Sequence, residues 1–354
     1  MKRDIGPENF ANCPLPIRTY DTVQLAHGSG GKMTDDLIQK LFLWAFDNPE
    51  LNRRDDNAIV EIAGDRLTYS TDSFVVDPIF FPNSDIGELA VNGTINDISV
   101  GGATPLYMSV GMIIEEGFPL DDLRRIVISM KEAAMKANVK IVTGDTKVVN
   151  KGKGDKIFIN TSGIGIIEHN YKIGPEYVKP GDVIIINGGI AEHGIAVLSK
   201  REGLSFETTV ISDTAPLNDL ISITIDTGGD AVHAMRDPTR GGVAATLNEF
   251  AEISQAGIII NEDRLPVKEP VRGACEILGF DPLYVANEGK LVVVVGKEKG
   301  EEVLQAMKGH PLGKDSAIIG EVISENGGMV SMRTAIGGSR IVDMPVGEQL
   351  PRIC

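Results

Sequence analysis

The sequence is poor in cysteine and has no long apolar run, and both absences exclude classes of protein. Its three cysteines, Cys13, Cys275 and Cys354, are widely spaced along 354 residues and include no CxxC pair. They cannot form a disulfide framework or a zinc site with that spacing. No apolar stretch approaches the roughly 20 residues of a membrane span, and the first twenty residues lack the apolar core of a signal peptide. We therefore expect a cytoplasmic protein with no membrane partner.

Positive charge is also scarce. The chain has 34 Lys and Arg against 50 Asp and Glu, a net charge of −16, and the basic residues are scattered. A nucleic-acid-binding protein needs basic patches to neutralise phosphates, so we expect no nucleic acid partner. Any anionic ligand must then be held locally, either by backbone amides or through a metal ion.

The length and the order of elements predict two α/β or α+β domains. A chain of 354 residues exceeds the usual size of a single core. Strands and helices mix in both halves, on either side of a segment near 168–182 that is rich in Pro and Gly. Strands are expected at about 58–62 and 67–71, and the clearest helix covers 121–138, where apolar residues recur on one face. We predict an N-terminal extension over 1–20, domains over 21–168 and 176–343, and a mobile tail over 344–354.

The predicted tail, PVGEQLPRIC, has two prolines, a glycine and no apolar pattern. Such a segment buries too little surface to offset its ordering entropy. From Pro345 it reaches roughly 30 Å at about 3.3 Å per residue. Its last residue, Cys354, cannot be prenylated because nothing follows it. An exposed thiol without a purpose is a redox liability, so a carrier thiol is the favoured interpretation, whereas Cys275 fits a helix core.

A glycine-rich segment, HGSGGKMT at residues 27–34, leads into the first helix. Its glycines let the backbone approach a phosphate, and a helix N-terminus offers unpaired amides. It is not a P-loop, since Ala26 and Met33 stand where that motif needs Gly and Ser or Thr. From these residues alone, a phosphate-binding loop and a plain structural loop are equally good interpretations.

Four aspartates stand at strand ends or in turns flanked by Gly or Thr: Asp72, Asp97, Asp145 and Asp237. Separate carboxylates that converge on one point suit a magnesium–nucleotide site, although each alone also fits a turn former. Lys147, two residues after Asp145, suits the stabilisation of charge on phosphates. Glu288 suits a general base if its site raises its pKa. Both also fit surface turns.

Several segments together resemble the HypE family of hydrogenase maturation proteins. They are STDSFVVDPIFFP, NGTINDISVGGATP, VTGDTKVV, RDPTRGGVAA, VANEGKLVVVV, HPLGKDSAIIGEV and the terminal PRIC. The family belongs to the ATP-binding superfamily of aminoimidazole ribonucleotide synthetase, selenophosphate synthetase and thiamine-monophosphate kinase. The resemblance runs from about residue 22 to the end, and PRIC is its most specific element.

The resemblance implies a two-domain PurM-like fold, α+β or α/β, with a flexible C-terminal tail. ATP would lie in the cleft between the domains, and the N-terminal domain would pair with its copy in a homodimer. The implied activity is that of a carbamoyl dehydratase. The carbamoyltransferase HypF would load Cys354, ATP would drive dehydration to a thiocyanate, and the cyano group would pass to iron on the HypC–HypD complex.

The resemblance also implies roles for individual residues. The magnesium ligands would be Asp72, Asp97 and Asp237. The ATP contacts would come from His27, Gly30, Gly31, Lys32, Asp72, Asn96 and Asp145. The catalytic residues would be Cys354 as carrier, Glu288 as base and Lys147 for phosphate stabilisation.

Two alternatives remain open from the sequence. The first is another ATP-dependent synthetase or kinase of the superfamily. Selenophosphate synthetase carries Cys or selenocysteine in its glycine-rich loop, where HGSGGK has none, and thiamine-monophosphate kinase has no need of a terminal cysteine. The second is a non-catalytic carrier, against which the set of aspartates counts.

Overall fold

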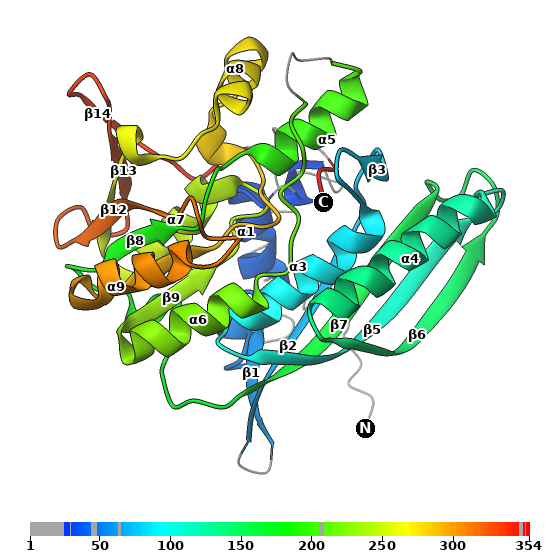
Figure 1. Cartoon of the computed structure of the whole chain (residues 1–354), viewed down its shortest axis with the longest axis horizontal. Coiled ribbons are helices and arrows are strands. Elements are labelled where there is room, and N and C mark those ends of the chain that lie inside the picture. Colours follow the sequence, from blue (N-terminus) through cyan, green and yellow to red (C-terminus); the bar gives the residue numbers. More distant parts are fainter. Residues whose placement is uncertain are drawn as a thin grey trace, which may run out of the picture.

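Two sheets with helices packed on them make up the described chain (Figure 1). The structure is a computed structural model that describes residues 25–28, 30–43, 48–62, 65–204, 209–346, 350 and 352–354. The first sheet has five strands in the order β1-β2-β7-β5-β6, and the second has seven in the order β14-β13-β10-β12-β8-β11-β9. The predicted extension over 1–20, with Cys13, lies outside the described residues.

The first sheet is covered on one face by two helices (Figure 1). Its strands are β1 (Ala58–Ile62), β2 (Asp65–Phe74), β5 (Thr104–Glu115), β6 (Lys140–Val149) and β7 (Ile157–Ile167). The helices are α3 (Ile86–Val100) and α4 (Leu120–Lys136), and a small ribbon of β3 (Phe80–Phe81) and β4 (Ser84–Asp85) precedes α3. β5 and β6 run parallel, and the other neighbouring strands of this sheet run antiparallel. α4 confirms the helix predicted over 121–138.

α3 is the helix that carries a predicted ligand into the interior. It is buried along nearly its whole length, because it lies between the first sheet and the second half of the chain. The side chain of Asp85 caps it by accepting hydrogen bonds from the amides of Gly87 and Glu88. A Cβ at Gly93 would lie 2.9 Å from the ring of Phe74, so glycine allows the close approach to β2. The last turn of α3 thus places Asp97 between the two halves.

The second sheet is built around buried strands. β11 (Val292–Val295) and β8 (Val183–Ile186) are continuous apolar runs, as expected where both faces of a strand are covered. The other strands are β9 (Val232–Arg236), β10 (Gly257–Asn261), β12 (Ala317–Ile323), β13 (Val330–Arg333) and β14 (Ser339–Ile341). The helices are α5 (Glu192–Glu202), α6 (Asn218–Gly228), α7 (Gly242–Ser254), α8 (Glu269–Leu278) and α9 (Lys297–Lys308).

Short helical segments complete the described chain. They are η3 (Leu25–Gly28), α1 (Lys32–Leu37), η4 (Ile38–Phe42), η5 (Leu51–Arg53), η6 (Pro175–Tyr177), η7 (Gly229–Ala231), η8 (Glu262–Arg264) and η9 (Pro282–Tyr284). Among the residues described, no helix combines the length and the apolar character needed to cross a membrane.

The chain ends between the two halves, next to α5 and β3 (Figure 1). Ile353 is 3% exposed and belongs to the same buried cluster as Phe74, Val197 and Ala286. The last residues therefore occupy a defined place inside the molecule in this structure, while the mobility of the tail remains a prediction.

Candidate active site between the two domains

A cavity of about 460 Å³ opens between the two halves, and both contribute to its lining. The lining includes Gly30, Gly31, Asp55, Asp56, Asp72, Asp97, Arg236, Asp237, Arg240 and Glu249. Local structure explains how distant carboxylates meet there. Asp72 lies on β2, Asp97 in the last turn of α3, and Asp237 directly after β9.

The carboxylates of the cavity are short of positive charge. Burial raises the pKa of Asp97 well above its usual range, and the nearby charges of Asp237, Asp56 and Asp72 raise it further. Burial likewise raises the pKa of Asp237 to about 7. Ser70 donates a hydrogen bond of 2.9 Å to Asp97, whereas Oδ2 of Asp237 is buried and has no hydrogen-bond partner among the described residues. A buried carboxylate oxygen in this state calls for a cation or another ligand.

The same group of residues fits a magnesium ion held partly by phosphate. In the part of the chain that the structure describes, no group of three or more His, Cys, Asp or Glu side chains is placed to hold a metal ion by itself. Magnesium, however, usually takes only one or two carboxylates and completes its shell with water and substrate phosphates. Asp72, Asp97 and Asp237 all line the cavity and could supply those carboxylates.

Arg236 is the positive charge that holds the cavity wall together. Its side chain is 4% exposed. The guanidinium donates to Asp55 and Asp56, each at 2.9 Å, and also pairs with Glu249. Asp55 and Asp56 precede β1, whereas Glu249 is on α7, so this network joins the two halves of the chain. The positive charge of Arg236 is thus already paired with three acidic side chains.

Cys354 and Glu288 lie in the same charged neighbourhood as these carboxylates. Burial raises the pKa of the Cys354 thiol strongly; Arg240 opposes this shift, while Glu288 and Asp72 add to it. Burial also raises the pKa of Glu288 well above its usual range, with further contributions from Asp237 and Asp72. Oε1 of Glu288 is buried without a hydrogen-bond partner among the described residues. The terminal thiol, which its raised pKa keeps neutral, therefore lies within range of the charge of Glu288.

Known families match both halves of the chain. The family described as AIR synthase related protein, N-terminal domain, matches residues 54–167, and the corresponding C-terminal domain family matches residues 179–333. Carbamoyl dehydratase HypE of Rhizobium leguminosarum bv. viciae is 51% identical over 332 residues, which cover 94% of this chain and 95% of that protein. The chain belongs to the HypE family.

Two solved HypE structures share the fold. A crystal structure of a HypE–HypF complex has a TM-score of 0.83 and 52% identity, and the match covers 87% of this chain and 99% of that chain. A crystal structure of HypE in complex with ATP has a TM-score of 0.80 and 49% identity, with coverages of 94% and 100%. The family and the PurM-like two-domain fold predicted from the sequence are therefore confirmed.

The glycine-rich segment touches the cavity and also the base of the tail. Gly30 and Gly31 line the cavity. His27 and Lys32 stand on either side of them in the sequence and are not among the lining residues. Gly30 has φ of +74°, and a Cβ there would lie 2.9 Å from the Cβ of Arg240. The amide of Lys32 donates a hydrogen bond of 3.0 Å to the carbonyl of Pro345. This segment is thus in direct contact with the start of the tail.

Asn96 does not face the cavity as the ATP contact expected from the sequence would. It is fully buried, and its Nδ2 donates to the carbonyls of Ala215 and Glu288, at 3.1 and 3.3 Å. Its Oδ1 accepts from the amide of Leu217 at 2.8 Å. Both ends of the side-chain amide therefore bind the second half of the chain, and the observed role of Asn96 is to join the two halves.

Asp145 and Lys147 also lie away from the cavity within one chain. Both are on β6, the outer strand of the first sheet, with side chains 67% and 68% exposed. They pair with each other at 2.6 Å, and this hydrogen bond lowers the pKa of Asp145. The structure does not bring them to Cys354 and Glu288, so their roles in ATP binding and phosphate stabilisation remain predictions.

Five further residues of the site are absent from the sequence-based set: Asp55, Asp56, Arg236, Arg240 and Glu249. A signal was present for four of them. Asp55 and Asp56 form a pair of acids directly before a predicted strand, and Arg236 and Arg240 flank Asp237 in RDPTRGG. Glu249, inside an amphipathic helix, carries no such signal.

Proposed function

We propose that this chain uses ATP to dehydrate an S-carbamoyl group on Cys354 to an S-cyanate, as expected for a member of the HypE family. The observation that carries the proposal is the position of the terminal thiol, inside the molecule and within range of the charges of Glu288 and Asp72, near a cavity lined by carboxylates. A HypE relative has been crystallised with ATP. The cyanate would provide the cyanide ligand of nickel–iron hydrogenase.

The proposed chemistry replaces a poor leaving group with a good one. The carbamoyl oxygen attacks the γ-phosphorus of ATP, ADP leaves, and the nitrogen loses one proton. The carbon–oxygen bond then breaks with phosphate as the leaving group, while the nitrogen loses its second proton and the nitrile forms. The balance is S-carbamoyl and ATP to S-cyanate, ADP, phosphate and one proton.

Within this scheme Glu288 is the base. Its raised pKa and its unpartnered oxygen both suit a carboxylate that takes protons from nitrogen near neutral pH. Arg240, close to both Cys354 and Asp72, is placed to stabilise the negative charge of the transferred phosphoryl group. Magnesium, held by Asp72, Asp97 and Asp237, would neutralise charge on the phosphates of ATP.

The partners follow from the same scheme. A HypF-type carbamoyltransferase would load Cys354, and a HypE relative has been crystallised in complex with HypF. A HypC–HypD complex would receive the cyano group in the cytoplasm. These three partners are proposals for this chain.

We also propose a homodimer formed through the first sheet. The face opposite α3 and α4 has no helix of the described chain on it (Figure 1). It leaves Tyr69 and Tyr107 about half exposed, at 48% and 45%, together with Ile113 at 47%. Apolar side chains gathered on an open sheet face are typical of an interface. Asp145 and Lys147 lie on the same sheet, and we assign their predicted roles to the assembled dimer.

The test of the proposed function is mass spectrometry of the C-terminal peptide. The protein is incubated with a HypF-type carbamoyltransferase and carbamoyl phosphate, and then with or without Mg-ATP. We expect a carbamoyl adduct on Cys354 that loses one water only when Mg-ATP is present. An unmodified Cys354 under both conditions would instead support a small-molecule kinase or synthetase.

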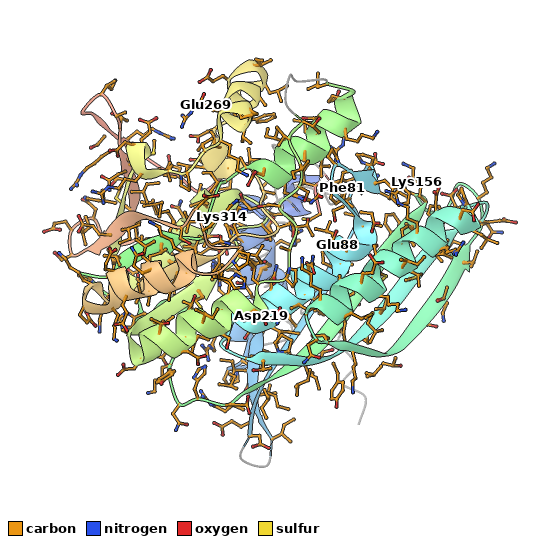
Figure 2. All side chains as sticks on the ribbon, in the orientation of Figure 1. Phe81, Glu88, Lys156, Asp219, Glu269 and Lys314 are labelled. Carbon is orange, nitrogen blue, oxygen red and sulfur yellow. The ribbon has the colours of Figure 1, made fainter. Side chains whose placement is uncertain are left out.

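Asp97→Asn should weaken Mg-ATP binding at least about tenfold, because an anionic ligand of the ion is replaced by a neutral amide. Isothermal titration with Mg-ATP measures the effect. Asp219→Asn is the matched control, since Asp219 is an exposed residue on α6 (Figure 2) and should bind Mg-ATP like the wild type. Equal affinities in the two variants would show that Asp97 is not a ligand.

A further inference from the structure

One stripe of α5 lies against the docked end of the chain. His193, Val197 and Arg201 follow one another at four-residue intervals and so share one face of the helix. His193 Nε2 lies 2.9 Å from the carbonyl oxygen of Ile353, and Arg201 donates to the carbonyl of Arg352 at 2.7 Å. Val197 belongs to the buried cluster that contains the Ile353 side chain.

On its other side the tail pairs with the chain segment that follows β2. The amide of Val75 donates to the carbonyl of Cys354, and the amide of Asp77 donates to that of Arg352, each at 3.1 Å. The Nε of Arg352 returns a hydrogen bond to the carbonyl of Val75 at 2.8 Å. The last residues thus run antiparallel to Val75–Asp77 and are held by two backbone hydrogen bonds and one from the Arg352 side chain, while Arg352 itself has a left-handed backbone with φ of +51°. The register of Cys354 relative to β2, and so to Asp72, is thereby fixed.

Only one assignment of donors and acceptors satisfies all the hydrogen bonds around His193. The Ile353 carbonyl can only accept, so Nε2 carries the proton. Burial lowers the pKa of His193, which keeps the ring neutral and makes Nδ1 an acceptor. Ser212 Oγ, 2.9 Å away, must then donate to Nδ1, and it accepts in turn from the hydroxyl of Thr214 at 2.7 Å. The ring of Phe81, on β3, packs edge-on against the ring of His193, with 5.4 Å between the ring centroids.

The loop that orients His193 also holds the proposed base. Asp213, between Ser212 and Thr214, accepts a hydrogen bond of 3.1 Å from the amide of Glu288. The carbonyl of Asp213 packs so closely on Gly289 that no side chain fits there. Contacts that hold the tail and contacts that hold Glu288 therefore come from neighbouring residues of one loop.

We propose that His193 is a positioning residue, which holds the Ile353 carbonyl and so places the Cys354 sulfur against Glu288. His193 touches no reacting atom; it acts through the tail. The effect on the reaction rests on the proposed function, but the docking itself does not and is measured without ATP.

The docking test is the rate at which iodoacetamide alkylates each cysteine, measured by peptide mass spectrometry. His193→Leu removes the donor but keeps an apolar side chain. We expect it to raise the alkylation rate of Cys354 about tenfold, the effect of one lost hydrogen bond. His193→Gln offers an amide N–H in a similar position and should return the rate toward the wild-type value. Cys275, buried on α8, reports on the fold and should stay protected in all three proteins.

The reaction test uses protein already carbamoylated on Cys354. His193→Leu should slow the ATP-dependent loss of water about tenfold while the affinity for Mg-ATP stays unchanged, and His193→Gln should restore the rate. A general loss of structure would change both quantities and would not be reversed by glutamine.

The proposal is overturned if His193→Leu leaves Cys354 as protected as in the wild type, or if His193→Gln behaves like His193→Leu. If Cys275 also becomes reactive in His193→Leu, Ser212→Ala decides. This substitution removes the hydrogen-bond donor to His193 Nδ1 and keeps the His193 ring in the core. An alkylation rate of Cys354 equal to that of the wild type would overturn the proposal. If docking changes as expected but the wild type never loses water with Mg-ATP, the proposed function fails and the role of His193 in docking stands.

Discussion

Cys354→Ala should form no cyanate at all, while Mg-ATP still binds with the wild-type affinity. The sulfur is the atom that carries the group from carbamoyl to cyanate, so no other side chain can take its place. The cavity lined by carboxylates is built without Cys354, and nucleotide binding therefore survives. Mass spectrometry of the C-terminal peptide and titration with Mg-ATP measure the two quantities on the same protein.

Cys275→Ala is the matched control for this result. Cys275 is a buried residue on α8 in a separate apolar cluster, and burial raises its pKa to about 11. Its replacement should leave cyanate formation intact. Water loss in Cys354→Ala, or its disappearance in Cys275→Ala, would mean that the carrier thiol has been assigned to the wrong cysteine.

Glu288→Gln should slow the loss of water about 10²- to 10⁴-fold, the usual contribution of a general base. Loading of Cys354 and binding of Mg-ATP should be retained, because the amide keeps the shape of the side chain. The single-turnover rate on carbamoylated protein measures the effect. Glu88→Gln is the control, since Glu88 is a part-buried acid near the start of α3 (Figure 2) whose pKa burial also raises.

The same variant has a pH signature. A base works in its unprotonated form, so a raised pKa means that the wild-type rate climbs with pH until Glu288 has lost its proton. In Glu288→Gln the slow residual rate should no longer rise with pH in this way. A wild-type rate in Glu288→Gln, or an unchanged pH profile, would require a different base.

The sequence predicts the fold class and several elements because their signals are local. β1 is the predicted strand 58–62, and α4 shows the one-sided apolar pattern of a helix on a sheet. α3 gives no such signal, because it is covered on nearly all sides and its apolar residues have no preferred face.

The site is harder to predict because its residues are brought together by tertiary contacts. Arg236 meets Asp55 and Asp56 across about 180 positions of sequence, and no local pattern reports such a pairing. Asn96 illustrates the converse case. It stands beside Asp97 in sequence, yet the helix turns the two side chains to different neighbours, and only Asp97 lines the cavity.

Because the last three residues bridge Val75–Asp77 on one side and α5 on the other, the tail behaves as an intramolecular ligand. If a partner loads Cys354 as proposed, it can do so only during the fraction of time that this ligand is dissociated. Docking that is more favourable by about 1.4 kcal/mol lowers that fraction tenfold. Weaker docking leaves the loaded group outside the cleft for longer. In the proposed cycle, the contacts of the tail with His193, Arg201 and Val75 would therefore set how one turnover is shared between receiving the carbamoyl group and converting it.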